Sequence, residues 1–478
     1  MKKLLPFIFL LPAILLEGCT NKWKEKLYAA PSLSEPVYQV ADRVPAKEGD
    51  PQKGFDYLIY GDYMAYGFPY RTFEKNFIKR LGKKVHDPKG KALARRGKNA
   101  PLPYSYTAFQ AENGAWVVNG NCFACHATHI NGELVLGAGN SFGDFRQSFG
   151  MGIRVFNAGL GVKYPSKTPE GAAYQHVKPI YTQLASRTAC PNIGMNPAAR
   201  TAEVTGLMRN PYTLELDPTV RDSLPFSPVN IATDVPPLWN VRKKNALYYN
   251  ALGRGDFTKL LMQITLASVD DTVHARKVQQ DFVDVLAWLE QLEPPAYPFP
   301  IVDSLAASGK MVFEEHCAGC HGTYGEKETY PNKIIPLHKI KTDPAYARAT
   351  LYSELVPWYN QSWYSTSPPR SHHQPSAGYV APPLDGVWVT APYLHNGSIP
   401  TLEDLLNSSQ RPDFWKRSGK NDDYDTQKVG WHYTAKSGGG GKWTYDTTKP
   451  GSSNTGHYYG DKLSQDERAA VIEYLKTL

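Results

Sequence analysis

Two copies of a five-residue motif constrain this chain more than any other feature. Residues 122–126 read Cys-Phe-Ala-Cys-His, and residues 317–321 read Cys-Ala-Gly-Cys-His. Two cysteines three positions apart can reach both vinyl groups of one haem as thioethers, and the histidine that follows then places its imidazole beneath the iron. A zinc site would instead need four less crowded ligands. The motifs predict two covalently bound haem c groups, held by Cys122, Cys125 and His126 and by Cys317, Cys320 and His321.

The net charge does not indicate a nucleic-acid partner. The chain carries a formal charge of +8 over 478 residues, but its Lys and Arg residues are spread along the chain without a dense block. About four haem propionates would offset roughly half of this excess. The length allows two to three domains, and 39 Gly and 38 Pro predict a loop-rich fold.

The N-terminus predicts export. Lys2 and Lys3 precede an apolar run over residues 4–16, which is too short to span a bilayer as a stable helix. The run ends in Leu-Glu-Gly-Cys, which resembles a bacterial lipoprotein signal in which the cysteine is lipidated. Glu17 departs from the small apolar residue usual at its position, so secretion with Cys19 unmodified is the alternative. Both readings place the protein outside the cytoplasm, and the first anchors it at the periplasmic side or outer membrane through Cys19.

Helical periodicity surrounds the second motif. Residues 303–315 place an apolar face on a helix that leads into it, formed by Leu305, Gly309, Val312 and Phe313. Ser464 and Glu467 form the signature of a capping box for a terminal helix, whose apolar residues are Val471, Ile472, Leu475 and Leu478. An entering helix and a closing helix that crosses it are typical of the cytochrome c fold.

A comparable closing helix is predicted over residues 276–292, and it stops before Pro294 and Pro295. Each half then has one haem motif. We expect a mainly α fold with two cytochrome c-like haem domains, comprising residues 20–298 and 299–478 after a signal peptide at 1–19. Long Pro- and Gly-rich insertions are predicted near residues 160–240, 325–380 and 407–456.

Three stretches resemble a known family. Residues 381–406 read Ala-Pro-Pro-Leu-Asp-Gly-Val-Trp-Val-Thr-Ala-Pro-Tyr-Leu-His-Asn-Gly-Ser-Ile-Pro-Thr-Leu-Glu-Asp-Leu-Leu. Residues 450–460 read Pro-Gly-Ser-Ser-Asn-Thr-Gly-His-Tyr-Tyr-Gly, and residues 235–244 read Val-Pro-Pro-Leu-Trp-Asn-Val-Arg-Lys-Lys. These resemble the bacterial di-haem cytochrome c peroxidase superfamily, and Trp388 and Asn396 make the rubber-oxygenase-like branch the closest. The resemblance covers most of residues 110–478.

The resemblance implies different work for the two haems. The C-terminal haem would be six-coordinate and relay electrons, with His321 as proximal and His457 as distal iron ligand. Two imidazoles lower the reduction potential relative to His/Met ligation and leave no position for a substrate. His395 is the rival ligand, although we prefer it near a haem propionate or at the contact between the haems.

The N-terminal haem would keep an open or weakly filled face opposite His126. By the resemblance, Trp239, Tyr248 and Tyr249 are candidate pocket residues, and ordinary aromatic packing is their alternative role. No distal ligand stands out from the residues, since seven are eligible: Met151, Met195, Met208, Met262, His129, His176 and His274. Glu112 and Gln147 lie near the motif, but a solvated surface role suits them better than acid–base chemistry.

Two functions follow as expectations. In the first, the chain is an oxidoreductase that uses O2 or peroxide at the N-terminal haem, with a periplasmic redox partner and an unidentified organic substrate. In the second, it is a lipid-anchored electron carrier with both irons six-coordinate. A calcium ion between the domains, as in some relatives, is left open. Cys190 is interpreted as a buried inert thiol.

Overall fold

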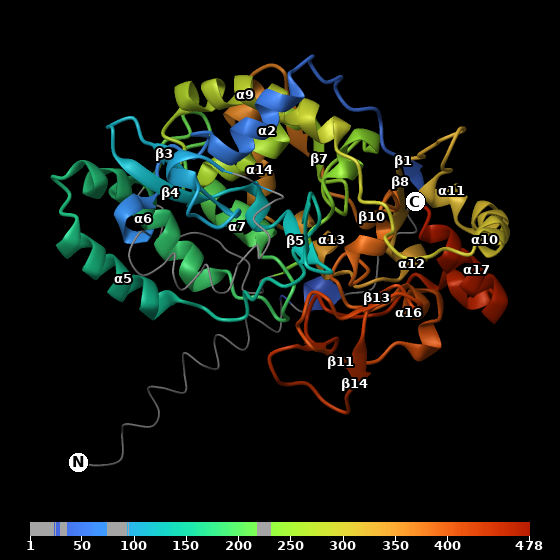
Figure 1. The fold of residues 1–478 in the computed structure, drawn as a ribbon. Helices are drawn as coiled ribbons and strands as arrows, with labels where there is room; N and C mark the ends of the chain where they lie inside the picture. The colour runs from blue at the N-terminus through green and yellow to red at the C-terminus, as the bar shows by residue number, and fades with distance from the viewer. Residues whose placement is uncertain (1–22, 24, 29–35, 74–92, 94, 218–230) are drawn as a thin grey trace, which may run out of the picture.

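The computed structural model describes residues 23, 25–28, 36–73, 93, 95–217 and 231–478 (Figure 1). About 41% of the chain is helical and 14% is in strands, which agrees with the predicted mainly α class. The strands are short and form small two- and three-stranded sheets. In the described part of the chain, no helix has both the length and the apolar character needed to cross a membrane. Cys19 lies outside the described residues, so lipidation there stays a prediction.

In the second half, the entering and closing helices cross at a glycine. These are α10 (Asp303–His316), which leads directly into the second motif, and α17 (Gln465–Leu475). A Cβ at Gly309 would overlap the carbonyl oxygen of Ala470, so only glycine permits this close crossing. The Val302 amide, before α10, donates to a Glu473 carboxylate oxygen at 2.7 Å. The capping box predicted at Ser464 is present.

The first half contains a similar close helix crossing at a glycine. Helices α2 (Pro51–Tyr60) and α9 (Thr272–Gln291) pack against each other, and a Cβ at Gly54 would overlap the Asp284 carbonyl oxygen. The Asp50 amide, before α2, donates to the Asp284 carboxylate at 2.7 Å. Figure 1 shows α2 lying along α9 at the top of the view, while α10 and α17 lie together at the right. Helix α9 confirms the predicted closing helix, whereas α2 was not foreseen.

A small sheet precedes the first motif, where the second motif has an entering helix. Strands β2 (Phe68–Pro69), β4 (Trp116–Gly120) and β3 (Tyr106–Gln110) pair in that order, and β4 runs into the motif. Asn121 then turns the chain: its side chain accepts from the Phe123 amide and donates to the Tyr104 carbonyl. The motif therefore begins in a single 3₁₀ turn, Cys122–Ala124, and the hairpin β5 (Ala127–Ile130) and β6 (Glu133–Leu136) follows it.

The predicted insertions contain more regular structure than their Pro and Gly content suggested. The first contains most of the α5 (Gly150–Lys163) and α6 (Pro169–Arg187) hairpin and α7 (Ala198–Leu207). Helix α6 starts with a Thr168 cap that accepts from the Gly171 amide, followed by Pro169. The third carries a sheet of order β14-β11-β15, formed by Tyr433–Ala435, Phe414–Arg417 and Thr444–Asp446.

The second insertion completes the core of the first half. It contains β8 (Lys333–Pro336), α12 (Leu337–Ile340), α13 (Ala345–Leu351), α14 (Leu355–Gln361), α15 (Trp363–Thr366), β9 (Ser371–His373) and β10 (Gly378–Val380). Tyr359, Trp363 and Tyr364 are buried in the same apolar cluster as Phe123, and β9 pairs with β7 (Gly253–Gly255). The boundary predicted at residue 298 falls between α9 and α10, but the packing crosses it, so the domain division stays a prediction.

Replacing Gly309 by alanine should destabilise the protein by about 1–3 kcal/mol, because the new methyl group forces α10 away from α17. Denaturant unfolding of the haem-loaded protein measures this. Gly159→Ala in α5 is the matched control, since nothing lies within 4 Å of the added carbon. That variant should be as stable as the wild type or up to about 1 kcal/mol more stable. Equal stability of Gly309→Ala and wild type would contradict the close crossing.

Candidate haem sites

The second motif presents one histidine in a defined orientation. Cys320 and His321 end the short helix α11 (Ala318–His321), and Gly322 follows with φ of 82°. The Nδ1 atom of His321 is 2.8 Å from the Pro382 carbonyl oxygen. A carbonyl only accepts, so Nδ1 carries the proton and Nε2 keeps its lone pair for a metal. Burial lowers the pKa of His321, which favours the neutral imidazole.

His457 faces this imidazole. The ring centroids of His321 and His457 are 6.2 Å apart. Two imidazole nitrogens bound to one metal ion at about 2 Å each, the usual metal–imidazole distance, put the ring centroids about 6 Å apart. The spacing therefore fits a single iron held between the two rings. Burial, then the neighbouring His321 and Arg411, lowers the pKa of His457 to about 3, so this ring is neutral as well.

The backbone holds His457 in place. Its φ is 50°, in the left-handed region, and its amide donates to the Ile340 carbonyl at 2.8 Å. Gly456 before it also has positive φ, and a Cβ there would overlap the Thr342 amide nitrogen. The His457 Nδ1 atom is buried and has no hydrogen-bond partner. The cavity between the rings is mostly apolar and is lined by Leu384, Leu402, Leu405, Leu463, Val471 and Leu475.

The first motif is buried in the same manner, but no imidazole of the described residues is found opposite His126. The His126 amide donates to the Cys122 carbonyl at 3.0 Å, and the Asn196 amide group donates to Cys125 Sγ at 3.0 Å. Burial lowers the pKa of His126 to about 4, and the Pro236 carbonyl opposes this shift. His126 Nδ1 makes no hydrogen bond of normal geometry, although the Pro236 carbonyl interacts with this imidazole. Both donor sets fit haem c.

The segments that supply these two carbonyls are repeats of each other. Residues 235–241 read Val-Pro-Pro-Leu-Trp-Asn-Val, and residues 381–387 read Ala-Pro-Pro-Leu-Asp-Gly-Val. The two repeats also have matching backbone conformations beyond these residues. At matching positions, Tyr248 and Leu394 have φ of 70° and 67°, and Ala251 and Gly397 have φ of 55° and 66°. Each repeat then closes a β-bridge, Leu247 with Gly253 and Tyr393 with Ile399.

The two repeats also bind each other reciprocally. The Asp234 amide donates to the His395 carbonyl at 2.8 Å, and the Val380 amide donates to the Tyr249 carbonyl at 2.8 Å. Asp234 matches Val380 in the repeat, and Tyr249 matches His395. The two hydrogen bonds are therefore equivalent, as they would be if a local twofold axis related the two repeats. The axis relates the carbonyl facing His126 to the carbonyl facing His321.

Trp239 lies at the contact between the repeats and does not line the cavity. Its indole donates to the Asp385 carbonyl at 2.8 Å. A Cβ at Gly386 would approach the Trp239 ring to 3.2 Å, so the ring packs flush against this glycine. Trp239 thus connects the segment of the first haem site to that of the second. The prediction that it borders the distal pocket of the first haem stays a prediction.

Tyr248 and Tyr249 line this cavity, which includes Cys317, Cys320 and His321 of the second motif and none of the first motif's residues, so their role beside the first haem stays a prediction. The Tyr248 hydroxyl accepts a hydrogen bond of 3.0 Å from the Gln263 amide group. Tyr249 faces Asp234, and burial raises the pKa of both groups. Gln263 is buried beside the cavity and escaped the sequence analysis because a lone Gln within an apolar run carries no motif.

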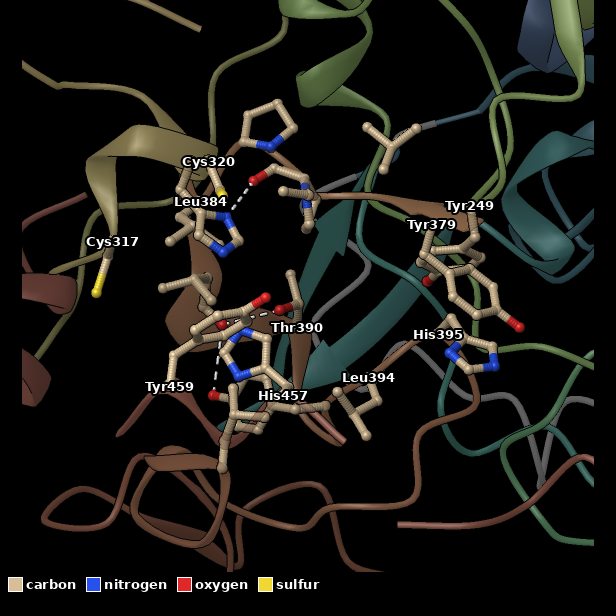
Figure 2. A pocket seen from close by; sticks show the side chains of 18 of the residues that line it. Tyr249, Cys317, Cys320, Tyr379, Leu384, Thr390, Leu394, His395, His457 and Tyr459 are labelled. Carbon is tan, nitrogen blue, oxygen red and sulfur yellow. Dashed lines mark hydrogen bonds between the residues drawn. The ribbon is translucent and has the colours of Figure 1, made fainter. Parts of the chain in front are cut away.

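His395 lies at the far end of the cavity from His457. Figure 2 shows it beside Tyr249 and Tyr379, while His457 and Tyr459 lie near Cys320. Its ring stacks on Tyr379 with centroids 4.1 Å apart, and its Nε2 has no hydrogen-bond partner. Of the two rival ligands, the structure brings only His457 opposite His321.

The remaining candidates are dispersed. Met195 accepts hydrogen bonds from Tyr445 and Ser452, and His176 is 3.2 Å from Asp270 and stacks on Tyr66. The others comprise exposed Met151, buried Met208 and Met262, His129 beside Tyr104, and His274 on α9. Glu112 and Gln147 are exposed, as expected. Cys190 is buried, and burial raises its pKa to about 12, in keeping with an inert thiol.

Among the described residues, no three His, Cys, Asp or Glu side chains gather as they would around a metal ion. A calcium site is therefore left as an expectation. Such sites also use backbone carbonyl ligands.

Known families match the second half. Residues 306–380 match the cytochrome c family, and residues 378–416 match a family described as RoxA-like, cytochrome c-like. The chain carries a c-type cytochrome domain. This match supports covalently bound haem c and electron transfer at the second motif, and it relates the cytochrome to RoxA-like proteins. The first motif lies outside both matches.

Two curated relatives come from Sinorhizobium fredii (strain NBRC 101917 / NGR234). The protein y4iJ is 34% identical over 253 residues, which cover 39% of this chain and 41% of y4iJ. The protein y4iM is 28% identical over 304 residues, which cover 53% of this chain and 65% of y4iM. The cytochrome thus spans less than two thirds of each of these relatives.

Replacing His457 by alanine should convert the second haem from low-spin to high-spin, because the variant lacks the imidazole opposite His321. The optical spectrum of the oxidised, haem-loaded protein measures this, and added imidazole should restore the low-spin form. His395→Ala is the matched control and should keep the wild-type spectrum. A low-spin His457→Ala protein, or loss of the low-spin form in His395→Ala, would contradict the assignment.

Proposed function

We propose that this cytochrome is an exported di-haem oxidoreductase of the cytochrome c peroxidase superfamily. The N-terminal haem would react with O2 or peroxide, and the C-terminal haem would relay electrons to it. One observation carries the proposal: the two sites share a repeated scaffold, but only the second has an imidazole facing its proximal histidine among the described residues. The closed site suits electron relay, and the other suits a reactive iron.

The two repeats differ in the residue that they place at one matching cavity position. The second repeat places the apolar Leu394 in the cavity, whereas the first repeat places Tyr248 there with a similar φ. Gln263 fixes the Tyr248 hydroxyl by a hydrogen bond, so that a polar group is held in a mostly apolar space. Such a group can position a bound oxidant and hold a proton near it.

The contact between the repeats supports the relay. When bound, the haems supply one-electron chemistry. Trp239 packs on Gly386 and donates to the Asp385 carbonyl, and it thereby fixes the spacing of the two segments that carry Pro236 and Pro382. Lys243 adds an ion pair with Asp385 at 2.6 Å. A rigid, aromatic contact of this kind suits transfer between the two sites without movement of the halves.

The cellular context forms part of the proposal. The charged and apolar N-terminal residues support export, and Cys19 would carry the lipid anchor. A periplasmic redox partner would then supply or remove electrons. The proposal names no organic substrate.

Carbon monoxide binding tests whether one haem iron is open and the other is closed. The fully reduced, haem-loaded protein should bind one CO for every two haems, because His457 closes the second site and the first is open. Optical titration measures the ratio, and the pyridine haemochrome assay counts the haems. A ratio of zero would indicate an electron carrier with two closed irons, and two CO per two haems would show that His457 is not a ligand.

A further inference from the structure

Helix α5 exposes an apolar stripe to solvent. Met151, Val155 and Val162 follow one another at intervals of four and seven residues, which places them on one face of the helix. Their exposed fractions are 77%, 68% and 84%. Phe149, just before the helix, is also 64% exposed. No charged residue occupies this line, which is unusual for the outer face of a soluble helix.

The stripe is not the face of α5 that packs against α6. The opposite face of α5 is already buried, through Asn157 and Leu160. Asn157 donates to Thr182 on α6 at 2.9 Å and accepts from Tyr174 on the same helix. The Phe149 amide donates to the Ala185 carbonyl at 2.7 Å. Helix α5 is therefore fixed on α6 with its apolar stripe turned outwards.

The surroundings of the stripe are cationic. Between residues 143 and 187, the only acidic side chains are Asp144 and Glu170, and Asp144 pairs with Arg146 at 2.8 Å. The same stretch contains six basic residues: Arg146, Arg154, Lys163, Lys167, Lys178 and Arg187. An apolar stripe within a cationic margin complements a surface that is anionic outside and apolar beneath.

The hairpin is also placed where it can reach a flat surface. Figure 1 shows α5 and α6 at one edge of the molecule, on the opposite side from α10 and α17. We propose that α5 lies in the headgroup region of an anionic lipid bilayer, with Met151, Val155 and Val162 inserted towards the acyl chains. This contact is independent of the haem chemistry and would orient the cytochrome on a membrane.

Vesicle binding tests this proposal. The probe is a vesicle of phosphatidylcholine and phosphatidylglycerol at about 3:1, compared with pure phosphatidylcholine. Every sample is the haem-loaded exported chain carrying Cys19→Ser, so that no acyl chain is attached. We expect the protein to sediment with anionic vesicles, Met151→Asp/Val155→Asp to bind at least tenfold more weakly, and high salt to weaken binding. Val273→Asp is the matched control because Val273 is 69% exposed on α9, and it should bind like the parent.

Unchanged haem spectra and circular dichroism establish that the variants fold. Failure of the parent protein to bind anionic vesicles would overturn the proposal, as would equal binding by the double variant. Size-exclusion chromatography tests whether the stripe instead contacts a second copy of the protein. If the parent protein is a dimer and the double variant is a monomer, the stripe is a contact between copies, and the membrane proposal is overturned.

Discussion

Two backbone hydrogen bonds organise the centre of this molecule. Asp234 donates to His395 in the other repeat, and Val380 returns the same bond to Tyr249. Because the pair is reciprocal, it fixes each repeat relative to the other and brings the two Pro-Pro-Leu turns together across Trp239. These turns supply the carbonyls that face the two motif histidines. The separation and relative orientation of the candidate haem sites therefore follow from one short, doubly bonded contact.

The interior around this contact contains groups that are costly to bury alone. Burial lowers the pKa of the Arg417 guanidinium to about 9, and Asp234 opposes that shift. The Arg417 side chain lies over the rings of Phe142, Trp431 and Trp443 and donates to the Ser141 carbonyl. The orphaned ring nitrogens of His395 and His457 add to this cost. Haem bound at the candidate sites would add interactions that the haem-free protein lacks, so haem attachment and folding should be coupled.

Much of the fold around the second motif could be predicted, because its elements have local signals. The periodic faces of α10, α17 and α9 are confirmed, and so is the Ser464 cap. Helix α2 escaped prediction since it is short and lies about 60 residues before its motif, separated by a sheet. Helix α6 carried a usable signal, Thr168-Pro169-Glu170, that was masked by the Pro and Gly content around it.

The candidate sites were predictable only in part, because some of their residues come together only through long-range folding. The motif residues are contiguous in sequence, but the choice between His457 and His395 depends on long-range folding. The repeat was missed because few identities connect Val235-Pro-Pro-Leu to Ala381-Pro-Pro-Leu, whereas the matching φ values are a property of the backbone. Trp239 was assigned to a pocket by resemblance, which stays a prediction, and its contact with Gly386 comes from a turn distant in sequence.

The central claim is that one scaffold, used twice, holds one closed iron and one open iron. Electron paramagnetic resonance of the oxidised, fully haem-loaded wild-type protein tests this most directly, because low-spin and high-spin ferric haems give separate signals. The account predicts one low-spin signal of two imidazole ligands and one high-spin signal, in equal amounts. Two low-spin signals that do not change on ligand addition would contradict it, as would a protein that carries a single haem.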